Sequence, residues 1–445
     1  MISRRNFIRL SGQIGFAGAT MPLWSSLAST RAFAQESINN YKAIVVISLI
    51  GGNDGNNMLI PLDSAEYNEY ASLRPSIALS QASCIPLSSG SSSASFGLHP
   101  SLVNVANYYN NKKGLFVANV GPLGAPATKA QLLQTPTLIP ATLMSHVAGR
   151  AQWESATTVN MPNTGWGGRI ADFLISQSGS LPPLLDAGGE SIFTVGSSVQ
   201  GITVQANSGA GLPLPVGINS AILSIAANDV ASKNQIVSQV AHVQAAAFKE
   251  QEIITQAMAS NSPLKTGFPQ TQSGFGNVMS TIAQVINGRS VIGASRQIFY
   301  CNQGNYDSHG SQLLMQSEGL TELDAGLGAF MSALDEMGLS NQVLICTLSE
   351  FNRTMQANST LGTDHAWGNH QMILGGGITG GRVIGSMPDL ELGGSSDLGS
   401  QGIWIPTTSV TQMTAGIGSW MGLSSSQLGA AFPDLVNFGN QSVQL

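Results

Sequence analysis

Short, continuous apolar runs that end in polar loops are the clearest pattern along this chain. Two of them, KAIVVISLI at 42–50 and VLICTL at 343–348, are rich in β-branched residues. Such runs are typical of strands buried on both faces of a parallel sheet. The shorter runs at 114–120, 297–300 and 372–374 predict further strands.

Apolar residues recur with the spacing of a helix in much of the chain between these runs. The stretch 313–337 has apolar residues every three or four positions, which predicts an amphipathic helix. Helical patterns also occur at 278–288, at 412–423 and from 218 to about 260. The alternation predicts an α/β fold with a mainly parallel central sheet flanked by helices. We expect one domain over 35–445, with a helical insertion at about 205–290.

The first 34 residues have the features of a cleaved export signal. SRRNFIR at 3–9 resembles the twin-arginine signal of bacterial export, and a weakly apolar stretch follows at 14–27. Ala32-Phe33-Ala34 has the small-x-small pattern that precedes a cleavage point. We therefore expect the twin-arginine export machinery to carry the folded protein to the periplasm or another location outside the cytoplasm.

Composition agrees with an exported protein and argues against nucleic acid as a partner. Charged residues make up 9% of the chain, and loss of the signal would remove four arginines and no acid, changing the net charge from −6 to −10. The three cysteines lack the close spacing of a disulfide framework or a cysteine-based zinc site. No apolar run after the signal approaches the length that spans a bilayer.

Acids and histidines follow three of the predicted strands. Asp54 lies in the glycine-rich turn after 42–50, Glu350 comes directly after 343–348, and Asp307 and His309 follow 297–300. Ligands of open α/β sheets bind beyond the carboxyl ends of the strands. Asp307 and His309 would point the same way in an extended segment, as two ligands of one ion would need. Asp54 has a second interpretation, because an Asx turn would use the same carboxylate.

The loop after 343–348 adds Arg353, Asp364, His365 and His370 to this group. Asp, Glu and His side chains are the ligands of many divalent metals. The sequence therefore predicts a metal site, and zinc, manganese, magnesium and calcium all remain candidates.

Ser145 and His146 precede a predicted helix and form a second group of interest. A hydroxyl at the positive end of a helix would either cap the helix or attack a bound phosphoryl or acyl group. His146 has three interpretations: a metal ligand, a general base or an ordinary partly buried histidine.

Five strings occur in order after the signal, namely GGNDGNNMLIP, SHVAGRAQWES, NYDSHGSQ, SEFNRT and GTDHAWGNH. Together they resemble the exported bacterial family known as domain of unknown function 1501, which is similar in fold to the alkaline phosphatase and sulfatase superfamily. The resemblance implies an alkaline phosphatase-like domain with two metal ions at the strand ends and a Ser, Thr or modified Cys nucleophile. Asp54 matches the first metal ligand, and Ser145 matches the nucleophile.

The resemblance leaves two assignments for the remaining ligands. In one, Asp364 and His365 form the superfamily's Asp-His pair. In the other, which we favour because Glu350 follows a strand directly, Glu350 takes that place and His365 or His370 supplies the histidine. Phe351 then stands where a histidine is expected, so a single-metal site is an alternative.

Two functions follow from these observations. The first is an exported metal-dependent hydrolase of phosphate or sulfate esters, in which Ser145 or a metal-bound hydroxide attacks and Arg353 holds the anion. A formylglycine sulfatase is disfavoured, because CIPLS at 84–88 lacks the arginine of the sulfatase signature. The second is a non-catalytic exported protein that retains the fold and binds a polysaccharide or helps to assemble another exported protein.

Overall fold

The computed structural model describes residues 40–88, 95–159, 162–189, 191–204, 234–259 and 262–445. The predicted signal at 1–34 and the stretch 205–233 of the predicted helical insertion lie outside these residues.

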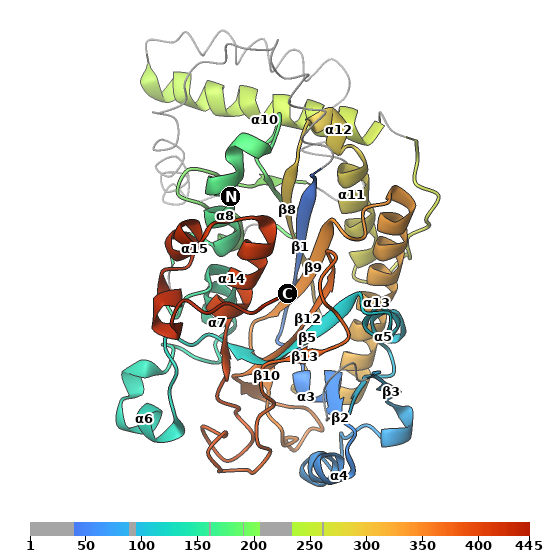
Figure 1. Ribbon diagram of the computed structural model, residues 1–445, viewed down its shortest axis with the longest axis vertical. Helices are drawn as coiled ribbons and strands as arrows, with labels where there is room; N and C mark the ends of the chain where they lie inside the picture. The colour runs from blue at the N-terminus through green and yellow to red at the C-terminus, as the bar shows by residue number, and fades with distance from the viewer. Residues whose placement is uncertain (1–39, 89–94, 160–161, 190, 205–233, 260–261) are drawn as a thin grey trace.

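A mixed, mainly parallel sheet forms the centre of the molecule (Figure 1), which confirms the predicted fold class. In the described part of the chain it consists of β1 Lys42–Leu49, β5 Gly114–Gly121, β6 Leu184–Asp186, β7 Ile202–Thr203, β8 Arg296–Gln303, β9 Val343–Ser349, β12 Asn369–Gly375, β13 Val383–Ile384 and β14 Thr408–Ser409. Their order is β13-β5-β12-β9-β1-β8-β6-β7, and β14 pairs with β5. β1 is parallel to both β8 and β9, whereas β12 is antiparallel to β9 and β5.

Alternate residues of β1 face two different layers of helices, as the two-residue repeat of a strand requires. Val45 and Ile47 pack in one buried cluster with side chains from α5 Val103–Asn110, α11 Phe275–Asn287 and α13 Gln312–Met337. Ile44 and Val46 pack in a second cluster with α7 His146–Ser155, α8 Trp166–Leu174, α14 Val410–Met421 and α15 Ser425–Ala431. Figure 1 shows these two layers on opposite sides of the sheet. The helices predicted at 278–288, 313–337 and 412–423 are confirmed as α11, α13 and α14.

The other α-helices within the described residues are α3 Gly55–Met58, α4 Ser64–Leu73, α6 Lys129–Gln134, α10 Gln235–Ala259 and α12 Arg289–Ile292. Two small sheets contain β2 Leu59–Pro61, β3 Ile85–Pro86 and β4 Phe96–Leu98, and β10 Asn352–Arg353 with β11 His365–Ala366. None of the helices in the described residues has the length and hydropathy needed to cross a bilayer.

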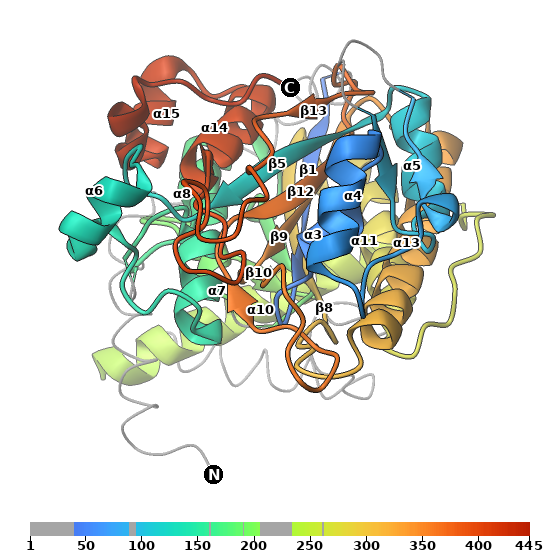
Figure 2. The same cartoon turned by 90° about the horizontal axis from the view of Figure 1, so that it is seen from below.

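The carboxyl ends of β1, β8 and β9 lie side by side because the three strands are parallel and adjacent. Figure 2 views the molecule from this side, where α3, α7 and β10 lie around the strand ends. The polar loops that follow these strands therefore meet at one edge of the sheet.

A buried ion pair fixes the turn after β1. The carboxylate of Asp54 caps α3 by accepting the N–H of Asn56 at 3.0 Å. It also accepts hydrogen bonds from Arg74, with Nη1 at 3.1 Å and Nη2 closer still, and from Nε2 of Gln312 at 2.8 Å. Both side chains of the ion pair are fully buried.

Loss of Arg74 would leave the Asp54 carboxylate buried without its opposite charge. We expect Arg74→Ala to lower the free energy of unfolding by about 3–5 kcal/mol in urea denaturation. Lys113→Ala is the control, because the Lys113 and Asp335 side chains pair at 3.5 Å while 43% and 51% exposed. That variant should change stability by less than about 1 kcal/mol. Equal losses in the two variants would contradict the role of the buried pair.

Candidate metal site

Three histidines surround the carboxylate of Asp307 beyond the end of β8. Nε2 of His146 lies 3.6 Å from Oδ2 of Asp307, and Nε2 of His309 and of His365 lie 3.3 Å and 3.5 Å from Oδ1. The Nε2 atoms of His309 and His365 are 3.0 Å apart. A ligand atom from each of His146, Asp307 and His365 lies within 4.8 Å of the other two.

The Nδ1 atom of each histidine contacts an acceptor outside this cluster. His146 Nδ1 lies 2.6 Å from Oε2 of Glu350, and His309 Nδ1 lies 3.1 Å from Oδ1 of Asp364. His365 Nδ1 lies 2.7 Å from the backbone carbonyl oxygen of Met144. Carbonyl and carboxylate oxygens accept, so an imidazole with one proton would donate it from Nδ1 and direct the lone pair of Nε2 toward Asp307. Metal-binding histidines have this arrangement.

Close packing of α7 against the end of β9 places His146 beside Glu350. Gly149, in the first turn of α7, lies so near that a Cβ atom there would be 2.4 Å from the carbonyl oxygen of Glu350. Glu350 is fixed from the other side by the N–H of Gly51, which donates to Oε2 at 3.0 Å. Only 4% of the Glu350 side chain is exposed, so its carboxylate orients His146 and does not face the cluster.

A fully buried guanidinium holds Asp307 in its ionised form. Arg353 Nη2 donates to Oδ1 of Asp307 at 2.6 Å. Burial opposes ionisation of Asp307, but the hydrogen bond and the charge of Arg353 outweigh it, and the pKa of the Asp307 carboxyl lies below its usual value. Because 47% of its side chain is exposed, Asp307 also faces solvent.

His365 is held in its neutral form by burial against an aromatic ring. Its imidazole stacks on the ring of Phe351, with 4.1 Å between ring centroids. Burial lowers the pKa of His365. Neutral imidazole is the form that binds metals, so both Asp307 and His365 are in their ligand forms near neutral pH.

Four separations in the cluster are close to those between the ligands of a tetrahedral metal ion, with Oδ2 of Asp307 facing His146 and Oδ1 facing His309 and His365. Nitrogen and oxygen ligands at 2.0–2.1 Å from zinc are roughly 3.3 Å from one another. The ligand atoms of His146, Asp307, His309 and His365 are separated by 3.0 to 3.6 Å along the four contacts given above. Two imidazole lone pairs 3.0 Å apart also repel unless a cation or a proton lies between them.

The structure brings together part of the predicted metal site. Asp307, His309 and His365 lie in the cluster, and His146 joins them as one of its three predicted roles allows. Glu350 and Asp364 instead contact the outer nitrogens of two histidines, so neither assignment of the Asp-His pair describes the site.

Two predicted ligands lie elsewhere. The Asp54 carboxylate is surrounded by Arg74, Gln312 and the α3 backbone, which corresponds to the structural interpretation of that residue. His370 is buried on β12, where its Nδ1 accepts the N–H of Asn119 at 3.1 Å. Neither residue belongs to the group of possible metal ligands around Asp307 in the described structure.

Arg353 and Ser145 were the other two predicted catalytic residues, and the structure places them in different environments. Arg353 was expected to hold an anion, but its guanidinium donates to the carbonyls of Gly51, Gly52 and Thr363 as well as to Asp307. Four of its five N–H groups are engaged in this way and its side chain is fully buried, so the guanidinium is not presented to a substrate. Ser145 lies at the N-terminus of α7 as predicted, and within the described structure its hydroxyl makes no capping hydrogen bond.

Sequence reasoning did not identify the carbonyl of Met144 or the glycine at 149 as parts of this site. A backbone acceptor has no residue signature, and Gly149 within SHVAGRAQWES resembles any helical glycine. Both act by positioning a histidine, through a hydrogen bond in one case and close helix packing in the other.

A family model described as "Protein of unknown function (DUF1501)" matches residues 41–432. Among solved structures, the chain is similar to the PsFucS1 sulfatase from Pseudoalteromonas sp., at 12% identity over 82% of this chain and 70% of that chain, with a TM-score of 0.33. It is also similar to a phosphonate monoester hydrolase of Agrobacterium radiobacter, at 10% identity over 86% and 74%, with a TM-score of 0.37. A third is a protein in the alkaline phosphatase superfamily from Vibrio parahaemolyticus, at 8% identity over 95% and 76%, with a TM-score of 0.33. No curated protein matches the sequence.

Removal of a central ligand should abolish metal binding. We expect wild-type protein to bind one divalent ion per chain, and Asp307→Ala and His365→Ala to bind none, by elemental mass spectrometry after dialysis. His242→Ala removes an exposed histidine on α10 and should retain the ion. Retention of metal by both cluster variants would contradict the site.

Gly149→Ala should weaken the site without removing any ligand. The added methyl group would collide with the Glu350 carbonyl and move α7, and His146 with it, away from Asp307. We expect zinc affinity to fall roughly tenfold or more in competition titrations with a chelator. Gly429→Ala in α15 is the matched control, because nothing lies within 4 Å of a Cβ atom there. Equal affinity in the two variants would show that helix packing does not set the geometry.

Proposed function

The chain belongs to the DUF1501 family, and we propose that it is an exported, metal-dependent hydrolase of phosphate or sulfate esters. The observation that carries this proposal is the convergence of three histidine Nε2 atoms on the half-exposed carboxylate of Asp307. A purely structural site is typically closed, whereas this cluster opens to solvent and is accessible to a substrate.

One divalent ion would be held by His146, Asp307, His309 and His365. Three imidazoles and one carboxylate suit zinc better than magnesium or calcium, which prefer oxygen ligands. When bound, such an ion supplies Lewis acidity and positive charge beside the substrate. Asp54 and His370 are engaged elsewhere, so we favour one ion over the two implied by the resemblance.

The start of α7 is the part of the chain that would hold the anionic group. The first N–H groups of a helix have no partners within it, and the helix dipole places partial positive charge there. The Ser145 side chain does not occupy these groups within the described structure. The helix end therefore takes over the role that the sequence suggested for Arg353.

Ser145 is the nucleophile in this proposal because its two neighbours are fixed in the site. The carbonyl of Met144 accepts from His365, and His146 contacts Glu350. Ser145 Oγ would form a bond to phosphorus or sulfur and release its proton, while the ester oxygen leaves and takes up a proton. Water would then hydrolyse the serine ester, release phosphate or sulfate and restore the hydroxyl.

Export of the folded protein is also part of this proposal. It is supported by the twin arginines at 4–5 and the small-x-small pattern at 32–34. A protein that carries a metal ion gains from export after folding, because its ligands are assembled before it leaves the cytoplasm.

Turnover of simple esters tests the hydrolase proposal. We expect the zinc-loaded protein to hydrolyse at least one of p-nitrophenyl phosphate, bis(p-nitrophenyl) phosphate and p-nitrophenyl sulfate, and chelation to stop it. Ser145→Ala should lower kcat/KM on the order of 10³-fold while the metal content stays unchanged. Ser72→Ala, which removes an exposed hydroxyl on α4, should have no effect.

Absence of turnover by the metal-loaded protein would favour the non-catalytic alternative, an exported binding or assembly protein. Full activity of Ser145→Ala would be compatible with the metal site but would contradict the role of Ser145 as the nucleophile.

A further inference from the structure

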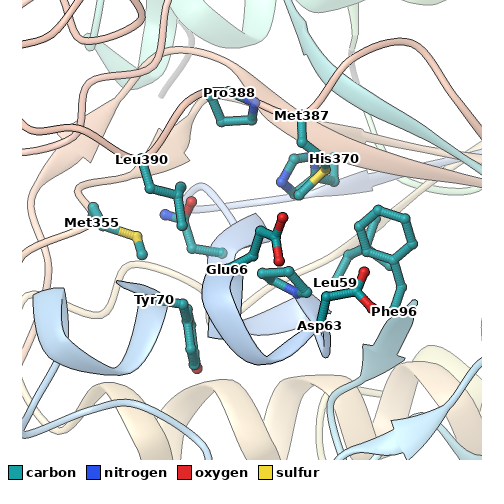
Figure 3. Close-up of a pocket in the computed structure, with 12 residues that line it drawn as sticks. Leu59, Asp63, Glu66, Tyr70, Phe96, Met355, His370, Met387, Pro388 and Leu390 are labelled. Atoms are coloured by element: carbon teal, nitrogen blue, oxygen red, sulfur yellow. The ribbon is translucent and has the colours of Figure 1, made fainter. Parts of the chain in front are cut away.

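A second concave site lies apart from the Asp307 cluster, beside α4 and β2 (Figure 3). Its volume is about 190 Å³. Its lining is mainly apolar and includes Leu59, Tyr70, Phe96, Met355, Met387 and Leu390. For comparison, an engineered apolar cavity of about 150 Å³ admits benzene. The site is therefore large enough for one ring-sized group.

His370 provides a buried polar group at the wall of this cavity. Its side chain is 2% exposed, and Nδ1 accepts the N–H of Asn119 at 3.1 Å. Burial lowers the pKa of His370 to about 4, so the ring is neutral at pH 7 and its proton is on Nε2. No hydrogen bond of Nε2 is found among the described residues, and Figure 3 shows the ring facing the cavity.

The cavity wall also contains Asn56 and Asp63, which have hydrogen-bond partners in the protein, and Glu66, which has none in the described structure. Asn56 donates to the carbonyl of Arg353 at 2.9 Å and accepts from Trp404 at 3.0 Å. The carboxylate of Asp63 accepts the N–H and the hydroxyl of Ser95 at 2.8 Å and 2.7 Å. Glu66 is exposed and has no such partner in the described structure.

The charge of the cavity wall selects for a cation. Asp63 and Glu66 are both acidic, and the lining contains neither lysine nor arginine. Figure 3 shows the Glu66 carboxylate directed into the space that His370 also faces. Aromatic rings and methionine sulfur atoms favour a flat apolar body between these two polar ends.

We propose that this cavity is a binding site for a small aromatic amine that carries an oxygen acceptor. The ammonium group would pair with Glu66, the ring would lie among the aromatic and methionine side chains, and the oxygen would accept from His370 Nε2–H. Glu66 belongs to α4, His370 belongs to β12, and the apolar side chains form the wall between them. The proposal is independent of any hydrolytic activity at the Asp307 cluster.

Calorimetric titration of the full-length mature protein with three probes tests each contact without changing the fold. Tyramine has both polar groups, phenethylamine lacks the hydroxyl, and 4-ethylphenol lacks the ammonium group. We expect tyramine to bind roughly fivefold more tightly than either of the others, since each lost contact is worth one hydrogen bond or ion pair.

Two variants locate the site. Glu66→Gln should weaken tyramine roughly fivefold but leave 4-ethylphenol unchanged. Glu69→Gln, which removes an exposed acid on the same helix outside the cavity lining, should change neither. Leu390→Trp should fill the cavity and abolish binding of all three probes.

Three results would each overturn the proposal. They are no binding of tyramine up to about 10 mM, equal affinities for the three probes, and unchanged tyramine affinity in Leu390→Trp. The first would mean that the cavity holds only water.

Discussion

The buried guanidinium of Arg353 is the interaction on which the candidate site depends. A charge removed from water must have its donors satisfied, or the fold loses several kcal/mol. Arg353 engages four of its five N–H groups, with the carbonyls of Gly51, Gly52 and Thr363 and with the carboxylate of Asp307. These acceptors belong to the turn after β1, the loop between β10 and β11, and the loop after β8. One side chain therefore fixes three segments together and holds a carboxylate at the centre of three histidines.

Around that carboxylate, the outer contacts of the histidines set the geometry of the cluster. Glu350, Asp364 and the Met144 carbonyl belong to different parts of the chain, yet each accepts from an Nδ1 atom. Because the acceptors fix the tautomers, the three Nε2 lone pairs converge without a rearrangement at the moment of binding. Glu350, which contacts His146, is buried, whereas the His309 and Asp364 side chains are both about half exposed.

The sequence was sufficient to name the side chains of the cluster among its candidates, but not to separate them from the candidates that lie elsewhere. Apolar runs at 42–50 and 343–348 became parallel neighbours, so the acids after them had to meet at one edge of the sheet. The role of Asp54 depends on Arg74 and Gln312, and no pattern in the sequence pairs these residues with it. The buried position of Arg353 could not be predicted for a related reason. The sequence around an arginine near acids does not indicate whether its side chain faces a substrate or is buried beneath a carboxylate, as Arg353 is beneath Asp307.

His365 and His370 show why residue type alone does not settle function. The β12 register shifts between Asn369 and Gln371, so simple alternation along the strand does not give the direction of His370. The deciding contact is the partner of Nδ1. A carbonyl accepts from Nδ1 of His365, which leaves a lone pair on Nε2 for a metal ion. An N–H donates to Nδ1 of His370, which leaves an N–H on Nε2 for an acceptor. The neighbouring backbone atoms therefore make Nε2 an acceptor in His365 and a donor in His370, although the two histidines are only five positions apart.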